Sequence, residues 1–202
     1  MFIKNGKPIK IIGFPESSIA EEYAVVFAKE NLDLLQKVSI ITPHEFKSLE
    51  NKEDYQYIIA FYIEMDLRKE ICDLLDDLNL DCVTYIDDNA HIFPNVKIGK
   101  GCFVGLGSII SWNCTIGDHC YIAMTTAMGH DVTVGRNTVT SPRVDFAGRA
   151  TIGENCKFLY KCSVLPKVKV CDWVVLSSLS NLTKDAQKPG RYVGHLARFI
   201  NP

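Results

Sequence analysis

The sequence predicts two successive parts. Residues 1–85 are expected to form a small α/β domain with a mostly parallel, Rossmann-like sheet, and residues 86–202 a parallel β-helix of six-residue repeats. Two patterns predict this: strand-like and helix-like runs alternate in the first part, and an apolar residue recurs at every sixth position in the second. Of the 202 residues, 47% are hydrophobic and 23% charged, which is the composition of a globular protein with a substantial core.

Charge and hydropathy argue against several classes of partner. The formal net charge is −2 and no long stripe of lysine and arginine is present, so we expect no nucleic-acid or anionic-membrane surface. The chain starts with MFIKNGKPIK, which lacks an apolar signal core, and no stretch of about 18 apolar residues is available for membrane insertion. The eight cysteines are therefore expected to be reduced, in a cytoplasmic protein.

The first part contains four strand-like and two helix-like runs. The strands, rich in β-branched and aromatic residues, are expected at residues 8–13, 37–42, 55–62 and 81–86. The helices, each with an apolar face, are expected at residues 18–32 and 66–78. Ser18 with Glu21 three residues later is a capping box at the start of the first helix.

Parallel sheets bind ligands at the carboxyl ends of their strands. The first strand ends at Gly13, and Ser17 and Ser18 follow at a helix N-terminus whose free backbone amides can receive a phosphate or another anion. A full glycine-rich fingerprint is absent, so the same residues also fit an ordinary turn between a strand and a helix.

The six-residue repeat runs from Ile86 to Leu182. Sixteen of its seventeen positions are apolar, and the exception is Thr140. Two positions before each of these lies a second column, in which no residue is larger than valine. Short flat strands joined by turns satisfy both columns when three hexads close one triangular coil of 18 residues, so this segment supplies about five coils.

Two residue types in the repeat have expected structural roles. Five cysteines lie in the column of small residues, where free cysteine acts as a small hydrophobe: Cys102, Cys114, Cys120, Cys156 and Cys162. Glycine recurs directly after the apolar column, at Gly99, Gly105, Gly117, Gly129, Gly135 and Gly153. We expect these glycines to supply the backbone angles of a tight corner.

One segment of the repeat carries residues suited to proton transfer. His130 follows Gly129 at a position that points off the coil, and imidazole titrates near neutrality, so it can take a proton from an attacking amine or hydroxyl. Asp131 can hold the ring in one tautomer and stabilise the imidazolium. The alternative is a surface histidine with a favourable neighbour.

The 18-residue period places two further residues beside His130. Trp112 is expected one coil before it and Gly148 one coil after it, so that an indole and a bare backbone shape a substrate slot beside the base. Trp112 is equally explained as a packing residue against the first domain or a neighbouring subunit.

Zinc is the alternative use of histidine in such a repeat, because some β-helices bind it through three histidines. Here the histidines are His44, His91, His119, His130 and His195. None form a close pair, and no cysteine spacing resembles a zinc motif, so we expect no metal.

The order of these features resembles one family of bacterial enzymes. A short α/β domain precedes the repeats, the repeats contain Gly129-His130-Asp131, and the chain ends in YVGHLARFI. This is similar to the bacterial sugar acyltransferases, comprising bacillosamine- and perosamine-type nucleotide-sugar N-acetyltransferases and sialic-acid O-acetyltransferases. Their closing motif is V-x-G-N-P-A-[RK]-x-[IV], of which residues 193–200 keep the frame, with His195-Leu196 in place of Asn-Pro.

The resemblance implies a left-handed β-helix, a homotrimer, and acetyl-CoA bound in a groove between adjacent subunits. It implies that His130 is the general base and that Asp131 raises its basicity. Gly148 and Tyr160 match positions whose main chain contacts CoA. The nucleotide of the acceptor sits against the first domain, where Gly13 matches the first glycine of the family's nucleotide loop.

The chain departs from the family pattern at several positions. Val139 replaces a second histidine that touches the thioester, and Arg143 replaces a glycine. The later glycines of the nucleotide loop are absent from residues 15–17. Arg143 and Arg149 are candidates for binding the CoA phosphates or an acidic sugar, and otherwise are solvated surface residues.

The leading hypothesis is therefore acetyl transfer from acetyl-CoA to an amino group on a nucleotide-linked deoxy-sugar. Neither cysteine nor serine is adjacent to His130 in sequence, which is compatible with transfer in one direct step. The alternatives are O-acetylation of a sugar hydroxyl, including a sialic-acid-like one, and a non-catalytic trimeric sugar-binding scaffold.

Overall fold

The computed structural model describes residues 7–15, 20–21 and 38–200. The chain forms two compact units, and it passes from the first to the second between Thr84 and Tyr85. No helix in the described part of the chain is long and apolar enough to span a bilayer.

A small parallel sheet forms the centre of the first unit. Its strands are β1 (Ile9–Ile12), β2 (Val38–Ile41), β3 (Gln56–Ile59) and β4 (Asp81–Cys82). All neighbouring strands are parallel, in the order β2-β1-β3-β4. Both faces of this sheet are apolar and covered, since the isoleucines of β1 and the residues of β3 are almost fully buried.

The helices of the first unit confirm one prediction and add one element. The helix expected at residues 66–78 is α3 (Met65–Asp77), which buries Ile71 and Leu75. The short helix α2 (Pro43–Ser48) was not predicted, although Thr42 and Glu45 form a capping box at its start. A 3-10 turn, η2 (Lys52–Asp54), follows it.

Two predicted elements of this unit differ from the structure or are only partly described by it. The run at residues 81–86 is not one strand: its first half is β4 of the small sheet, and its second half is β5 (Tyr85–Ile86), the first strand of the repeat. Of the helix expected at residues 18–32, the described residues Ala20 and Glu21 are helical. Its capping residue Ser18 lies outside the described residues.

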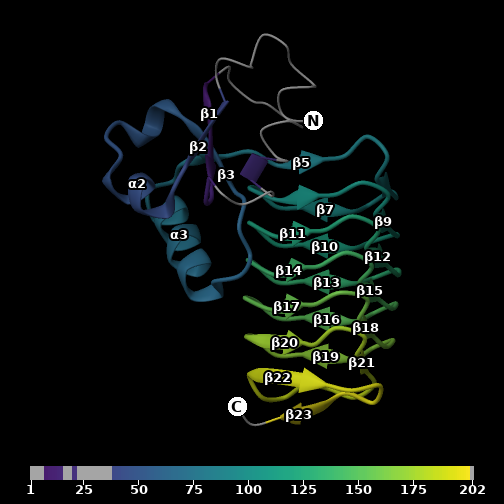
Figure 1. The fold of residues 1–202 in the computed structure, drawn as a ribbon. Helices are drawn as coiled ribbons and strands as arrows, with labels where there is room; N and C mark the ends of the chain where they lie inside the picture. Colours follow the sequence, from purple (N-terminus) through teal and green to yellow (C-terminus); the bar gives the residue numbers. More distant parts are fainter. Residues whose placement is uncertain (1–6, 16–19, 22–37, 201–202) are drawn as a thin grey trace. The chain divides into compact units, whose positions relative to one another are not determined.

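The second unit is a parallel β-solenoid of about six turns, against the five expected. Its strands stack in three walls, as Figure 1 shows for β5–β21. Wall 1 contains β5, β8 (Phe103–Val104), β11 (Tyr121–Ile122), β14 (Val139–Thr140), β17 (Lys157–Phe158), β20 (Val174–Leu176), β22 (Gly190–Val193) and the antiparallel β23 (Arg198–Ile200). Wall 2 contains β6 (His91–Ile92), β9 (Ile109–Ile110), β12 (Ala127–Met128), β15 (Asp145–Phe146), β18 (Ser163–Val164) and β21 (Asn181–Leu182). Wall 3 contains β7 (Lys97–Ile98), β10 (Thr115–Ile116), β13 (Thr133–Val134), β16 (Thr151–Ile152) and β19 (Lys169–Val170).

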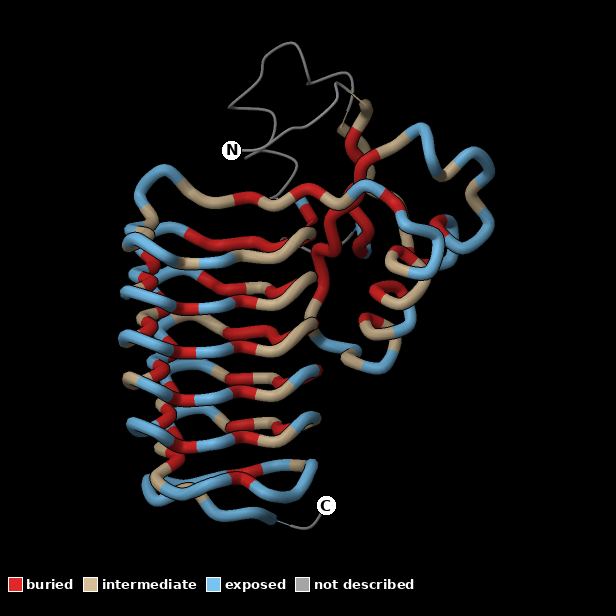
Figure 2. Tube along the Cα trace, turned by 180° about the vertical axis from the view of Figure 1, so that it is seen from behind, coloured by how far each residue is buried: buried red, intermediate tan, exposed pale blue. Residues whose placement is uncertain are grey.

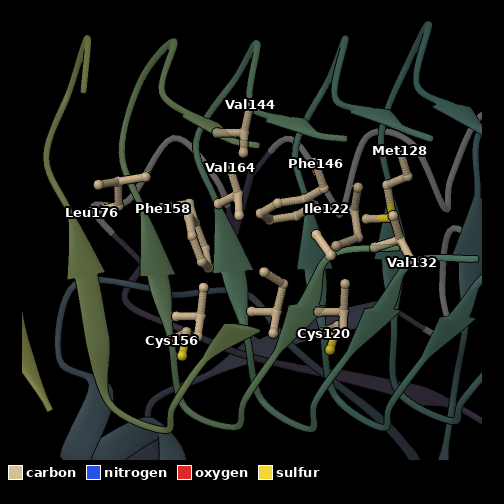
Figure 3. Packing of buried hydrophobic residues seen from close by; sticks show 14 of the residues in the cluster. Cys120, Ile122, Met128, Val132, Val144, Phe146, Cys156, Phe158, Val164 and Leu176 are labelled. Atoms are coloured by element: carbon tan, nitrogen blue, oxygen red, sulfur yellow. The ribbon is translucent and has the colours of Figure 1, made fainter. Parts of the chain in front are cut away.

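The two predicted columns line the interior of the solenoid. From Val104 to Leu182 every residue of the apolar column is 4% exposed or less, and from Cys102 to Ser180 every residue of the small column is 5% exposed or less. Figure 3 shows members of both columns meeting inside the coils, and Figure 2 shows buried and exposed residues recurring at the same places in successive coils. The exceptional Thr140 is accommodated because its hydroxyl accepts a hydrogen bond from the Ala123 backbone N–H at 2.9 Å.

The cysteines of the small column are interior packing residues, as predicted. All eight cysteines of the chain lie in its described part and none is in a disulfide. Burial raises the pKa of Cys156 and of Cys162 to about 12, so both are held as thiols. The Cys114 thiol donates to the carbonyl of Gly129 at 3.0 Å.

The glycines of the repeat have a different role from the one expected. The positive φ angle falls two residues later in each hexad, mostly on other residues, such as Asn113 (60°) and Asp131 (58°). A Cβ atom at Gly129 would lie 2.6 Å from the backbone nitrogen of Gly148, and one at Gly117 would lie 2.7 Å from that of Arg136. Glycine is therefore required because successive coils approach closely, not because of its backbone angles.

Candidate active site

The predicted base and its partner lie at the corner between walls 2 and 3, in the turn that joins β12 to β13. Nδ1 of His130 is 2.7 Å from Oδ2 of Asp131. The two side chains are 54% and 42% exposed, so a substrate can reach the ring. The left-handed conformation of Asp131 is one that a short polar residue such as Asp tolerates at this corner.

The second oxygen of Asp131 is also held. Asn113, one coil earlier, donates from Nδ2 to this oxygen, Oδ1 of Asp131, at 3.1 Å. The oxygen that faces His130, Oδ2, is also 3.8 Å from Nε of Arg149, one coil later. The hydrogen bond with His130, followed by that with Asn113, lowers the pKa of Asp131 below its usual value. Asp131 is therefore a carboxylate at neutral pH, and its Oδ2 accepts a hydrogen bond from Nδ1–H of the imidazole.

That assignment leaves Nε2 as the basic atom of the ring. With Nδ1–H donated to a carboxylate, the neutral imidazole presents a lone pair at Nε2. A general base requires this tautomer, because the accepting nitrogen must carry no proton of its own.

Gly148 provides the space that the ring occupies. The backbone N–H of Arg149 donates to the carbonyl of His130 at 2.8 Å, which places Gly148 one coil after the histidine, as the 18-residue period predicts. A Cβ atom at Gly148 would lie 2.9 Å from Nε2 and 3.1 Å from Cδ2 of His130. Any larger residue would displace the ring from its present position.

Trp112 lies one coil before the dyad of His130 and Asp131. Its carbonyl accepts a hydrogen bond from the backbone N–H of Asp131 at 2.9 Å. The indole is 47% exposed and rests against Phe93, with the ring centroids 5.7 Å apart. Trp112 therefore packs within the solenoid while leaving half of its surface open beside the dyad.

Tyr160 lies elsewhere. It follows β17 at the corner between walls 1 and 2, where its hydroxyl accepts a hydrogen bond from Nη1 of Arg143 at 3.3 Å. His130 is at the corner between walls 2 and 3, so one chain does not bring the two residues to the same corner. Val139, which replaces a family histidine, is on wall 1 and only 1% exposed.

In the first unit, the structure describes only part of the proposed anion site. Gly13 directly follows β1, and its backbone N–H donates to the carbonyl of Ile41 at 2.9 Å. A Cβ atom there would lie 3.1 Å from Cβ of Ala20 and 3.2 Å from the carbonyl oxygen of Ala60, so glycine fits a close approach of chain segments. Ser17 lies outside the described residues.

The other histidines do not gather near His130. His119 is buried at the corner between walls 3 and 1, and Nδ1 of His195 is 3.2 Å from Nδ2 of Asn181. Across residues 7–15, 20–21 and 38–200, no group of three or more His, Cys, Asp or Glu side chains could hold a metal ion.

Sequence reasoning missed one pair of residues at this site. It followed the 18-residue period from His130, which gave Trp112 and Gly148, but not from Asp131. The same step back from Asp131 gives Asn113 and then Asn95, whose amides are hydrogen-bonded to each other at 3.3 Å. The repeat length alone was sufficient to find them.

No protein-family model matches the chain, and no curated protein matches its sequence. Solved structures do match. The acetyltransferase domain of PglB from Neisseria gonorrhoeae has a TM-score of 0.84 at 15% identity, covering 96% of this chain and all of that one. PerB, the perosamine N-acetyltransferase of Caulobacter crescentus, has a TM-score of 0.83 at 19% identity, covering 98% of this chain and 99% of that one. This is the fold of the hexapeptide-repeat sugar N-acetyltransferases.

The similarity extends to further structures and covers nearly whole chains. WeeI from Acinetobacter baumannii has a TM-score of 0.67 at 16% identity, covering 96% of this chain and 99% of that one. The resemblance inferred from the sequence is thus confirmed at the level of the fold. The PerB structure contains CoA and GDP-perosamine, and a structure of the PglB domain contains acetyl coenzyme A.

Proposed function

We propose that this protein transfers the acetyl group of acetyl-CoA to an amino group on a nucleotide-linked deoxy-sugar, with His130 as the general base. The observation that carries the proposal is the exposed dyad, in which the bond from Nδ1 to Asp131 leaves Nε2 of His130 free to accept a proton. The shared fold of sugar N-acetyltransferases supports the choice of reaction.

The acetyl transfer needs one group that accepts a proton from the amine. The amine nitrogen of the sugar attacks the thioester carbonyl that acetyl-CoA supplies, the C–S bond breaks, and the coenzyme leaves as its thiol. The amine proton passes to Nε2 of His130, and Asp131 stabilises the imidazolium that forms. The imidazolium then gives this proton to the leaving sulfur, so the coenzyme departs as a thiol and the base is regenerated. The acceptor nitrogen must carry its lone pair, so turnover is expected to fall at low pH.

The residues near the dyad suit a CoA arm. Gly148 exposes backbone beside the ring, because no side chain is present to cover it. Arg143 is at the corner of Tyr160 and Arg149 is at the corner of His130, and both can pair with CoA phosphates.

The two units have separate roles in this proposal. The first unit, which ends at Thr84, is Rossmann-like and binds the nucleotide of the acceptor through Gly13 and Ser17. The solenoid, which begins at Tyr85 and is left-handed as in the family, performs the transfer. Trp112 contacts the sugar through its exposed face. The absence of disulfides among all eight cysteines fits a cytoplasmic enzyme.

We propose a homotrimer, and the position of Tyr160 supports a site shared between chains. A coenzyme that contacts both Tyr160 and His130 needs corners from two chains, since the two residues lie at different corners of one solenoid. Leu106 and Met124 share the corner of Tyr160 and are 50% and 41% exposed, which supports an apolar contact there. Light scattering should give three times the 22.7 kDa chain mass. A monomer would remove the intersubunit site.

The reaction is tested by thiol release from acetyl-CoA with a panel of UDP-, dTDP- and GDP-linked amino sugars. Each amino sugar is paired with its hydroxyl counterpart, which separates N-acetylation from O-acetylation. Release with an amino sugar and not with its counterpart is the expected result. Release only with a hydroxyl acceptor would replace the proposal by O-acetylation. No release and no calorimetric binding of acetyl-CoA would leave a non-catalytic scaffold.

A further inference from the structure

We propose that Asn113 is a positioning residue for the His130–Asp131 dyad, and that Asn95 fixes the direction in which the Asn113 amide points. The inference deepens the proposed function, since it concerns the same dyad. It rests on a column of four residues that stack at one corner: Asn95, Asn113, Asp131 and Arg149.

The hydrogen bonds in this column have one direction. Asn95 donates from Nδ2 to Oδ1 of Asn113 at 3.3 Å. Because the carbonyl of that amide is already engaged, its NH₂ group faces the next coil, where it donates to Oδ1 of Asp131 at 3.1 Å. A flipped Asn113 would place two oxygens against each other, at Asp131, and two NH₂ groups against each other, at Asn95.

The hydrogen bond from Asn113 to Oδ1 of Asp131 restricts the position of the other oxygen, Oδ2. A carboxylate pinned at one oxygen by a charge-assisted bond loses rotational freedom about its Cβ–Cγ bond. Its second oxygen then stays 2.7 Å from Nδ1 of His130. The ring is thus kept as the Nδ1–H tautomer, and the lone pair stays at Nε2, which lies beside Gly148.

Backbone conformation alone explains the residue type but not this contact. Asn95 and Asn113 have φ angles of 62° and 60°, and asparagine is one of the few residues that adopt such angles readily. However, the other residues at equivalent positions of this solenoid include arginine, lysine and threonine, so the corner itself does not demand asparagine. The amide is explained by its acceptor, Asp131.

The ionisable groups that act on Asp131 are few. In the described part of the chain, His130 and Arg149 are those that lower its pKa by their charge. A change at Asn113 therefore reaches the dyad through the hydrogen bond with Asp131 and not through a larger charge cluster.

The test compares two asparagine-to-glycine variants in the full-length protein. Asn113→Gly removes the amide and keeps a residue that tolerates positive φ. Asn155→Gly is the matched control, because Asn155 has a φ angle of 56° and a hydrogen bond to Asn137, but lies at the corner between walls 3 and 1. One readout is the tautomer of His130 in 15N-histidine-labelled protein at alkaline pH, assigned with His130→Asn. The other is kcat/KM for acetyl transfer.

We expect the wild-type ring to be the Nδ1–H tautomer, and Asn113→Gly to move it toward Nε2–H and lower kcat/KM about tenfold. Asn155→Gly should leave both unchanged. In Asn113→Asp, the additional negative charge should move the acid limb of the kcat/KM profile to higher pH. An unchanged tautomer in Asn113→Gly, or equal losses of kcat/KM in the two glycine variants, would overturn the inference. If no acceptor is turned over, the proposed function fails, while the tautomer measurement still decides the role of Asn113.

Discussion

Two corners of the solenoid carry asparagines at the same backbone position, with opposite surroundings. Between walls 3 and 1, Asn137 and Asn155 are 0% and 5% exposed, and their amides are 2.8 Å apart. Between walls 2 and 3, Asn95 and Asn113 are exposed, and their amides are 3.3 Å apart. The buried pair satisfies polar groups inside the protein, whereas the exposed column ends on the dyad. The same residue type thus serves stability at one corner and, in our proposal, chemistry at the other.

The largest expected effect is at the exposed corner. Asp131→Asn keeps a short polar residue at a positive φ angle but removes the charge that selects the tautomer of His130. Turnover should fall between about 10²- and 10⁴-fold in a steady-state thiol-release assay. Asp118→Asn is the control, because the carboxyl group of Asp118 lies near the other corner and accepts a hydrogen bond from the backbone N–H of Lys100. Similar activity losses in both variants would contradict a specific role for the dyad.

Gly148→Ala crowds the ring of His130 while leaving His130 and Asp131 themselves unsubstituted. The added Cβ would meet three atoms of His130 at 2.9 to 3.3 Å, so the ring must move by a few tenths of an ångström or more. We expect a loss of activity of about 10- to 100-fold with little change in melting temperature. Gly129→Ala should mainly lower the melting temperature, because its Cβ would lie 2.6 Å from the backbone nitrogen of Gly148. A stable, fully active Gly148→Ala enzyme would show that the ring position is not critical.

Asn137→Gly tests the buried corner. It leaves Oδ1 of Asn155 without the hydrogen bond that Asn137 donates, in a site shielded from water. The free energy of unfolding should fall by about 1–3 kcal/mol in urea denaturation, while turnover of the folded enzyme is unchanged. If turnover falls as it does for Asp131→Asn, the two corners do not have separate roles.

The smallest effect is expected for two buried cysteines of the small column, Cys156 and Cys162. Burial raises the pKa of Cys156 and Cys162 to about 12, so very little thiolate is present at pH 8. Brief treatment of the native protein with iodoacetamide should modify the half-buried Cys82 and Cys171 first and leave those two intact, with no loss of turnover. Peptide mapping by mass spectrometry measures this. Rapid labelling of Cys156 or Cys162 would show that the coils open readily.

The solenoid was predictable because its sequence period and its structural period are the same. An apolar residue every six positions and an 18-residue coil fixed which side chains point inward and which residues stack, as Trp112 and Gly148 do around the dyad. The predicted role of the glycines was wrong, because a sequence shows where glycine occurs but not whether its backbone angles or the close approach of another coil requires it. Coil spacing, at Gly129 and Gly117, is a three-dimensional property.

The first unit was less predictable because its elements are short and do not repeat. The strand expected at residues 81–86 is divided between β4 and β5, and nothing in its β-branched composition marks the break. Helix α2 was missed because six residues give too short an apolar pattern, although its capping box was readable. At the site, the adjacent His130 and Asp131 were visible in sequence. The 18-residue period also implied that Tyr160, 30 residues after His130, lies at another corner of the coil.

The most direct test of the account is the rate of thiol release from acetyl-CoA by His130→Asn at saturating acceptor, with coenzyme binding measured on the same sample. Asparagine preserves polarity at the corner but cannot accept the proton of the amine. Acetyl-CoA is expected to bind as in the wild type, while the rate falls at least about 10²-fold. A rate close to that of the wild type would contradict His130 as the general base.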